Sequence, residues 1–204
     1  AVKAYQELMH VYAAIEPPTW ALLLASATRK DGYGVDILDC DALRLTPEQS
    51  AQEISDRNPR LVCFVLYGQN PNSGTTSMIG GLAVLSELCN LRPDLKTCFV
   101  GSHISALPKE VLSYRGIDFV LINEGVYALR QLLATDLRSG LSKVEGIGYK
   151  DADGNHHFTN PGKLVPQELM DIDLPGYAWD LLPYKAKPLD LYRAHFWHSN
   201  FSHS

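Results

Sequence analysis

Several short polar segments contain residues whose types suit ligand binding, and the richest of them is Gly68–Thr76. It follows the apolar run Leu61–Tyr67 and precedes a helix that we expect to begin at Ser77 or Met78. Its candidate ligand-binding residues are Gln69, Asn70, Ser73, Gly74, Thr75 and Thr76. Carboxamides, hydroxyls and backbone amides together suit a neutral ligand rich in amides and phosphodiester oxygens, bound partly at a helix N-terminus. The absence of lysine and of GxxxxGK[ST] excludes a P-loop, while a solvated loop that caps the helix remains the alternative.

Two more polar segments follow apolar runs in the same way. The candidates after Thr97–Val100 are Gly101, Ser102, His103 and Ser105, and those after Asp118–Ile122 are Asn123, Glu124 and Gly125. A glycine at a strand end indicates a close approach of the backbone to another group. His103 either contacts a ligand or partner domain or makes a structural hydrogen bond. Glu124 either accepts a hydrogen bond from a ligand hydroxyl or caps the next helix.

The remaining reactive residues form no catalytic set. The sequence has no nucleophile elbow, no HExxH and no pair of carboxylates on one helix face. Cys40, Cys63, Cys89 and Cys98 form neither CxxC nor CxxxCxxC, so we interpret them as reduced core residues. The HxxH pair His195 and His198 is a weak metal pattern. The sequence therefore predicts ligand binding, and no reaction is assigned to this chain alone.

The elements that must position these segments alternate between strand and helix. Strand-like runs are Val35–Asp39, Leu61–Tyr67, Thr97–Val100 and Asp118–Ile122; helical patterns are Trp20–Lys30, a helix opening at Thr46, Ile79–Leu91, Pro108–Tyr114 and Val126–Leu137. This order predicts an α/β fold with a flavodoxin-like or Rossmann-like doubly wound parallel sheet. Ligands bind such sheets beyond the carboxyl ends of the strands, which is where the candidate segments fall.

The last third of the chain follows a different pattern. Val144–Tyr149 and His156–Thr159 flank a turn and predict a β-hairpin, and Asp173–Pro183 predicts an irregular linker. We therefore divide the chain into an α/β domain at residues 1–140 and a hairpin with linker at residues 141–204. The first residues, Ala1–Val11, are typical of helix or loop, whereas a doubly wound sheet opens with a central strand. We expect that strand to precede Ala1, or another segment to take its place.

Composition excludes several classes of partner. The chain has 46% hydrophobic and 20% charged residues and a net charge of -5, which gives no electrostatic footprint for nucleic acid or an anionic membrane. Its apolar runs are far shorter than the ~20 residues of a membrane span. It lacks the layout of a signal peptide, and its cysteines suit a reducing compartment, so we expect a cytoplasmic protein.

Five segments in this order resemble a known family. They are Pro17–Leu23 with Asp31–Asp39, then Gly101–Leu112, Asp118–Gly125, Val144–Tyr149 and Leu174–Pro183. Together they resemble the cobalamin-binding domain of B12-dependent radical SAM enzymes, over about residues 15–204. The last of them resembles the linker into the catalytic barrel of those enzymes.

The resemblance implies that the candidate residues bind cobalamin and that a radical SAM domain of the same chain holds a [4Fe–4S] cluster and S-adenosylmethionine. Such an enzyme performs methyl transfer or a radical rearrangement. This chain lacks the CxxxCxxC cluster motif, which the resemblance places beyond Ser204. No histidine lies in the DxHxxG motif that ligates cobalt in other cobalamin proteins. Two positions differ from the motifs of the family it resembles. Where the family usually has Gly-Gly, this sequence has Gly101-Ser102. Where the family has the second acidic residue of a Gly-Glu-Gly-Glu motif, this sequence has Val126-Tyr127.

Two other functions are compatible with an α/β domain of this length. A receiver-like or flavodoxin-like regulatory domain would bind no cobalamin, but a receiver needs an aspartate where Leu61–Tyr67 ends in Tyr-Gly. A dinucleotide enzyme would need GxGxxG after a strand, which the sequence lacks.

Overall fold

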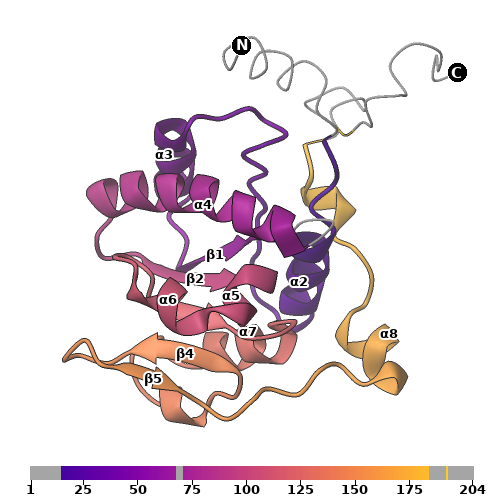
Figure 1. Ribbon diagram of the computed structural model, residues 1–204. Coiled ribbons are helices and arrows are strands. Elements are labelled where there is room, and N and C mark those ends of the chain that lie inside the picture. The colour runs from indigo at the N-terminus through magenta and orange to yellow at the C-terminus, as the bar shows by residue number, and fades with distance from the viewer. Residues whose placement is uncertain (1–14, 68–70, 184–191, 193–204) are drawn as a thin grey trace, which may run out of the picture.

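A five-stranded sheet forms the centre of the molecule in the computed structural model, which describes residues 15–67, 71–183 and 192 (Figure 1). The strands are β1 (Leu61–Val65), β2 (Lys96–Val100), β3 (Phe119–Leu121), β4 (Ile147–Lys150) and β5 (His156–Phe158), in that spatial order. The pairs β1–β2 and β2–β3 are parallel, and β3–β4 and β4–β5 are antiparallel. The predicted α/β fold is confirmed, and the predicted hairpin extends the same sheet through β4.

Helices cover both faces of the sheet. They are α2 (Thr19–Lys30), α3 (Pro47–Arg57), α4 (Pro71–Leu91), α5 (Ser102–Ala106), α6 (Pro108–Ser113), α7 (Val126–Leu133) and α8 (Met170–Asp173), with 3₁₀ turns η1 (Leu141–Lys143), η2 (Gln167–Leu169) and η3 (Trp179–Leu181). None of the described helices is both long and apolar enough to cross a membrane.

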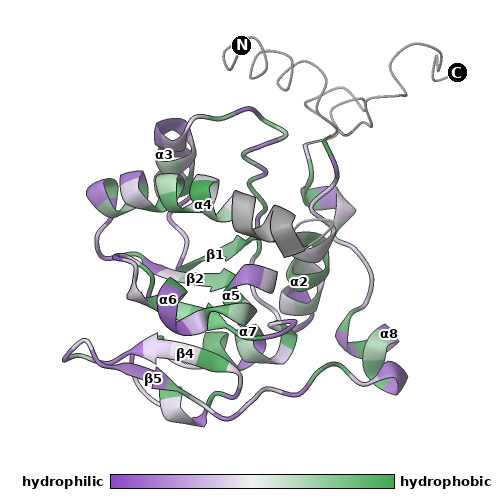
Figure 2. Ribbon diagram, viewed as in Figure 1, coloured by the Kyte–Doolittle hydropathy of each residue, from purple (hydrophilic) through white to green (hydrophobic). Residues whose placement is uncertain are grey.

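The pleat of the central strands divides the core into two parts, one on each face of the sheet. Cys98 and Val100 of β2 pack with α2 and α7 on one face, and Phe99 packs with α4, α5 and α6 on the other. Side chains of successive residues in a strand point to opposite faces, so an unbroken apolar run is needed where both faces are covered. Figure 2 shows that the central strands β1 and β2 are apolar, whereas the outer strand β5 is largely polar.

The start of α3 shows how directly the sequence specifies where a helix begins. Thr46 Oγ1 accepts a hydrogen bond from the Gln49 amide at 3.3 Å, and Gln49 Oε1 accepts one from the Thr46 amide at 2.9 Å. Pro47 occupies the first turn, where its missing N–H is not needed. The helix predicted to open at Thr46 is confirmed.

One strand and one helix start predicted from the sequence are wrong. Val35–Asp39 was expected to be a strand, but residues 33–39 form no strand, because no described strand lies beside them to supply hydrogen bonds. Leu38 instead packs against the core between α3 and α4, and Asp36 pairs with Arg57 at 3.3 Å. The helix expected from Ser77 or Met78 already begins at Pro71, since a proline is well suited to a first helical turn.

Strand β1 has a free edge within the described part of the chain. All five of its residues are half-buried, whereas all three of β3 are buried. The Leu66 amide donates to the Val100 carbonyl at 2.8 Å, so alternation turns the backbone groups of Leu61, Cys63 and Val65 away from β2. No strand among the described residues pairs with that side.

Candidate functional site

The turn after β3 is held by contacts from four other segments. Asn123 and Gly125 both have left-handed backbones, with φ of 63° and 73°. The Asn123 amide donates to Ser105 Oγ at 2.9 Å, and its carbonyl accepts from the Tyr67 hydroxyl at 2.8 Å. The Glu124 carbonyl accepts from Trp20 Nε1 at 3.0 Å. The Glu124 carboxylate accepts through Oε2 from the Val165 amide at 2.9 Å, so this turn is a fixed platform.

Two aromatic residues that support this platform were missed by the sequence reasoning. Trp20 lies in the first turn of α2 and Tyr67 lies two residues after β1, and their rings are 5.3 Å apart with an interplanar angle of 53°. Burial of the phenol, and then the nearby charge of Glu124, raise the pKa of Tyr67 to about 12, so its hydroxyl stays a donor at neutral pH. The sequence predicts Tyr67 to be the last residue of an apolar strand, and only that position at the strand end indicates a role at this edge.

Gly101 has a packing role at the end of β2. A Cβ atom at this position would lie 2.3 Å from the Leu66 carbonyl oxygen and 3.0 Å from Ile104 Cδ1. The close approach predicted here is therefore between Gly101 and the backbone that leaves β1. It allows the chain segments after β1 and β2 to lie against each other.

Ser102, the next residue, carries a buried hydroxyl that has no hydrogen-bond partner among the described residues. It is the first residue of α5, and His103 beside it is half-buried. An unpaired buried hydroxyl costs free energy, about 1–3 kcal/mol, unless another group satisfies it. The Ser102 hydroxyl therefore has unused hydrogen-bonding capacity at the same edge as the Asn123–Gly125 turn.

The remaining predicted site residues are only partly covered by the structure. Gln69 and Asn70 lie outside the described residues. Ser73, Gly74, Thr75 and Thr76 form part of the first turns of α4, of which the backbone alone is described. Because α4 follows β1, its N-terminus lies at the edge where α5 and the turn after β3 begin. The three candidate segments are therefore brought to one edge of the sheet.

This edge is suited to binding rather than to metal ligation by the protein. No group of three or more His, Cys, Asp or Glu side chains in the described parts of the chain is arranged to hold a metal ion. His195 and His198 lie outside those parts. The groups present are hydroxyls, backbone amides, the Glu124 carboxylate, the Asn123 carboxamide and the His103 imidazole, all of which exchange hydrogen bonds with amides and hydroxyls of a ligand.

Comparison with known proteins identifies the family of the chain. The sequence profile of the B12 binding domain matches residues 6–133, more than half of the 204-residue chain. The chain belongs to the B12-binding domain family. No curated protein sequence matches it significantly.

Solved structures similar to this B12-binding domain come from larger proteins. One is the cobalamin-dependent S-adenosylmethionine radical enzyme OxsB with aqua-cobalamin bound, with a TM-score of 0.65, 17% identity, and coverage of 85% of this chain and 23% of that one. Another is the radical S-adenosylmethionine methyltransferase TsrM from Kitasatospora setae with tryptophan substrate and a SAM analog, with a TM-score of 0.56, 19% identity, and coverage of 73% and 28%. These likenesses show the fold, and the chain spans about a quarter of the length of either structure.

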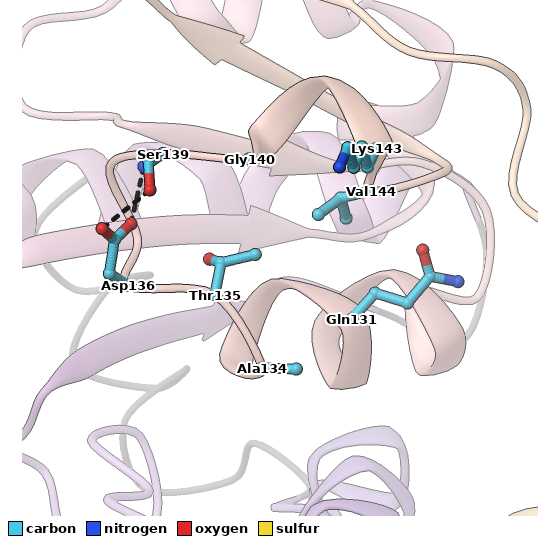
Figure 3. A pocket seen from close by; sticks show the side chains of 8 residues that line it. All are labelled: Gln131, Ala134, Thr135, Asp136, Ser139, Gly140, Lys143 and Val144. Atoms are coloured by element: carbon cyan, nitrogen blue, oxygen red, sulfur yellow. Dashed lines mark hydrogen bonds between the residues drawn. The ribbon is translucent and has the colours of Figure 1, made fainter.

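A shallow hollow of about 450 Å³ in the B12-binding domain lies away from the candidate site (Figure 3). It is lined by residues from the end of α7 to η1: Gln131, Ala134, Thr135, Asp136, Ser139, Gly140, Lys143 and Val144. The Asp136 carboxylate there accepts hydrogen bonds from the amides of Arg138 and Ser139 at 2.8 and 2.6 Å. Since α7 starts at the carboxyl edge of the sheet and ends here, the hollow lies at the opposite edge, and its acidic group is already satisfied.

Proposed function

We propose that this B12-binding domain binds cobalamin at the carboxyl edge of β1, β2 and β3. The single observation that carries the proposal is the buried Ser102 hydroxyl, which has no partner among the described residues, at the edge that also holds the Asn123–Gly125 turn. Membership of the family and similarity to structures determined with cobalamin support the identity of the ligand. The proposed contacts are the candidate residues at this edge: Gln69, Asn70, Ser73, Gly74, Thr75, Thr76, Gly101, Ser102, His103, Ser105, Asn123, Glu124 and Gly125.

The groups at this edge fit the periphery of cobalamin, which is rich in amides and carries a phosphodiester. Ser102 offers a hydroxyl that can donate or accept. Glu124 uses Oε2 for the Val165 amide, and its Oε1 accepts no hydrogen bond from the described residues, which leaves it for a ligand amide or hydroxyl. The N-terminus of α4 favours a negatively charged phosphodiester through the helix dipole and the amides of its first turn.

Cobalamin supplies a cobalt centre that carries a methyl group, and the protein around it binds and orients the corrin. No histidine of the sequence lies in a DxHxxG motif, so the residues that would hold cobalamin are those at the carboxyl edge of the sheet. The contacts listed above act on the corrin side chains and the phosphodiester.

We further propose that the domain works within a longer radical SAM polypeptide, with residues 1–140 as the cobalamin domain and 141–204 as hairpin and linker. The second domain would hold a [4Fe–4S] cluster and S-adenosylmethionine and perform methyl transfer or a radical rearrangement. The similarity to OxsB and TsrM supports this organisation, because the chain covers only 23–28% of those proteins. The four free cysteines suit a cytoplasmic location, and the net charge gives no support for nucleic acid as a partner.

The test is a titration with hydroxocobalamin followed by gel filtration and visible absorbance. We expect the corrin spectrum to elute with the protein, and Ser102→Ala to weaken binding about fivefold to tenfold, as expected for one hydrogen bond. Ser113→Ala is the matched control, because the Ser113 hydroxyl is exposed and already donates to the Glu110 carbonyl at 2.6 Å. Protein that elutes free of corrinoid would contradict the proposal, and so would equal binding by both variants.

A further inference from the structure

Cys63 and Cys98 lie opposite each other on neighbouring strands. Strand β1 pairs in parallel with β2, and the register makes Cys63 and Cys98 direct partners (Figure 1). Both side chains belong to the apolar cluster that contains residues of α2 and α7, so they point to the same face of the sheet. Neighbouring strands lie about 4.8 Å apart, and the Cα atoms of disulfide-bonded cysteines lie about 4.4–6.8 Å apart. The backbone therefore places the two thiols within reach of a disulfide.

The two thiols interact with each other and differ in exposure. Burial, and then the interaction with the Cys63 thiol, raise the pKa of the Cys98 thiol well above its usual value. Cys98 has an exposed fraction of 0%, whereas Cys63 is half-buried. Cys63 also lies on β1, whose outer edge pairs with no other described strand. A small reagent therefore reaches the pair through Cys63, and Cys98 is the inner partner.

The other two cysteines are placed differently. Cys89 belongs to α4 and packs on the opposite face of the sheet, beside Gly116. Cys40 follows the segment 33–39, and its thiol lies 3.9 Å from the Leu38 carbonyl oxygen. Neither of them lies opposite another cysteine in the sheet that the structure describes. The pairing of β1 with β2 thus singles out one pair among the four free thiols.

We infer that Cys63 and Cys98 form an oxidation site, at which hydrogen peroxide converts the two thiols to a reversible disulfide. The Cys63 thiolate attacks the peroxide, so that an S–O bond forms, the O–O bond breaks, and hydroxide leaves and takes up the thiol proton as water. The Cys98 sulfur then attacks the Cys63 sulfur, which forms the S–S bond, breaks the S–O bond and releases a second water with the Cys98 proton. The two thiols lose two electrons in total, and one peroxide gains them.

Strain makes this disulfide easy to reduce. Directly opposite residues of a parallel pair keep their Cβ atoms about as far apart as the strands, whereas a disulfide needs a Cβ separation of about 3.8 Å. Closing the bond requires β1 to shift toward β2, and β1 is half-buried throughout whereas most of β2 is buried. A strained disulfide is readily reduced by other thiols. Since β1 leads to Tyr67 and β2 leads to Gly101, oxidation changes the spacing of the strand ends beneath the candidate site, whichever ligand that site binds.

Peroxide treatment followed by peptide mapping tests this inference. The folded protein is treated with hydrogen peroxide without corrinoid, its remaining thiols are alkylated in urea, and it is digested without reductant. We expect a linked Cys63–Cys98 peptide as the predominant cross-link, and we expect millimolar glutathione to remove it. Protein without this linked peptide would overturn the inference, whether its thiols stay reduced or Cys63 is oxidised to a sulfinic acid. A cross-link that persists in glutathione would also overturn it.

Two single substitutions provide the matched comparison. Cys63→Ala removes the half-buried member and leaves the buried one in place, so we expect Cys98 to remain a free thiol after peroxide treatment. Cys89→Ala, at a cysteine on the opposite face of the sheet, should leave the yield of the linked peptide unchanged. Equal oxidation of Cys98 in wild type and in Cys63→Ala would overturn the inference. Corrinoid binding is measured separately on the reduced protein, so failure of the ligand proposal is distinguishable from failure of this one.

Discussion

Tyr67, which follows β1, donates its hydroxyl hydrogen to the backbone carbonyl of Asn123, which follows β3, across a distance of 2.8 Å. This hydrogen bond spans β2 and joins the ends of two strands that are not neighbours in the sheet. It holds Asn123 in a left-handed conformation that a non-glycine residue adopts at some cost. The geometry of the candidate cobalamin edge therefore depends on a side chain that is not itself a proposed contact.

Tyr67→Phe should remove the hydrogen bond to Asn123 and make this edge less rigid, while the phenyl ring keeps the packing of the core. Removing one hydrogen bond costs about 1 kcal/mol, so we expect stability to fall by about that amount and hydroxocobalamin affinity to fall about fivefold. Urea unfolding and an absorbance titration measure the two effects. Tyr114→Phe, at an exposed tyrosine outside the edge, is the control. Unchanged affinity in Tyr67→Phe would show that the turn is held without this bond.

Gly101→Ala should destabilise the whole domain. The new Cβ would lie 2.3 Å from the Leu66 carbonyl oxygen, and relief requires β1 and β2 to separate where they leave the sheet. We expect a loss of about 1–3 kcal/mol in urea unfolding. Gly34→Ala serves as control, because a Cβ there meets nothing within 4 Å. Equal stability of the two variants would argue against the close approach.

Asp136→Asn should change the dependence of stability on pH. Hydrogen bonds from the Ser139 and Arg138 amides lower the pKa of the Asp136 carboxyl from 3.8 to about 2. A depressed carboxyl pKa stabilises the fold above the unfolded pKa, and this contribution is lost as pH falls through the folded value. The difference in unfolding free energy between wild type and Asp136→Asn should therefore be constant above about pH 5 and shrink towards pH 2.

Urea unfolding between pH 2 and pH 6 measures this difference. The control is Asp171→Asn, since Asp171 is exposed and the described residues donate no hydrogen bond to its side chain. A difference that stays constant down to pH 2 is incompatible with the turn-capping role of Asp136.

Arg130→Gln should release the segment from Leu164 to Leu182, which we call the connector, while leaving the sheet intact. Arg130 pairs with Asp31 at 2.6 Å and with Asp173 at 3.0 Å, so one substitution removes two ion pairs. If the free energy of local opening falls by about 1–2 kcal/mol, cleavage within residues 164–182 by a dilute protease should accelerate on the order of tenfold. Arg57→Gln, which removes surface pairs with Asp36 and Glu53, should leave this cleavage rate unchanged.

The sequence predicted those features that depend on local pattern. The runs around Cys98 and Val120 were identifiable as strands because both faces of β2 and β3 are buried, and Thr46 with Gln49 marked a helix start through a capping box. The strand expected at Val35–Asp39 failed because a strand also needs a neighbour, and β propensity says nothing about which segment supplies it.

The structure brings the candidate residues to one edge of the sheet, and their role in binding a ligand stays a prediction. Asn123, Glu124 and Gly125 could be placed at the carboxyl edge from strand order alone. The roles of Trp20 and Tyr67 arise from contacts across 104 and 56 residues of sequence, which no local pattern encodes. The same holds for Asp173, whose partners Tyr127 and Arg130 become adjacent to it only after the connector crosses α7.

The free edge of β1 has a consequence for handling the protein. Leu61, Cys63 and Val65 direct backbone donors and acceptors to a side where no described strand pairs with them, and the side chains beside these groups are apolar and half-buried. Such an edge is a template on which extended segments of other molecules add by β-augmentation, and native proteins usually cover or charge it. Within the residues that the structure describes, the edge of β1 is therefore open to β-pairing with an extended segment of another molecule.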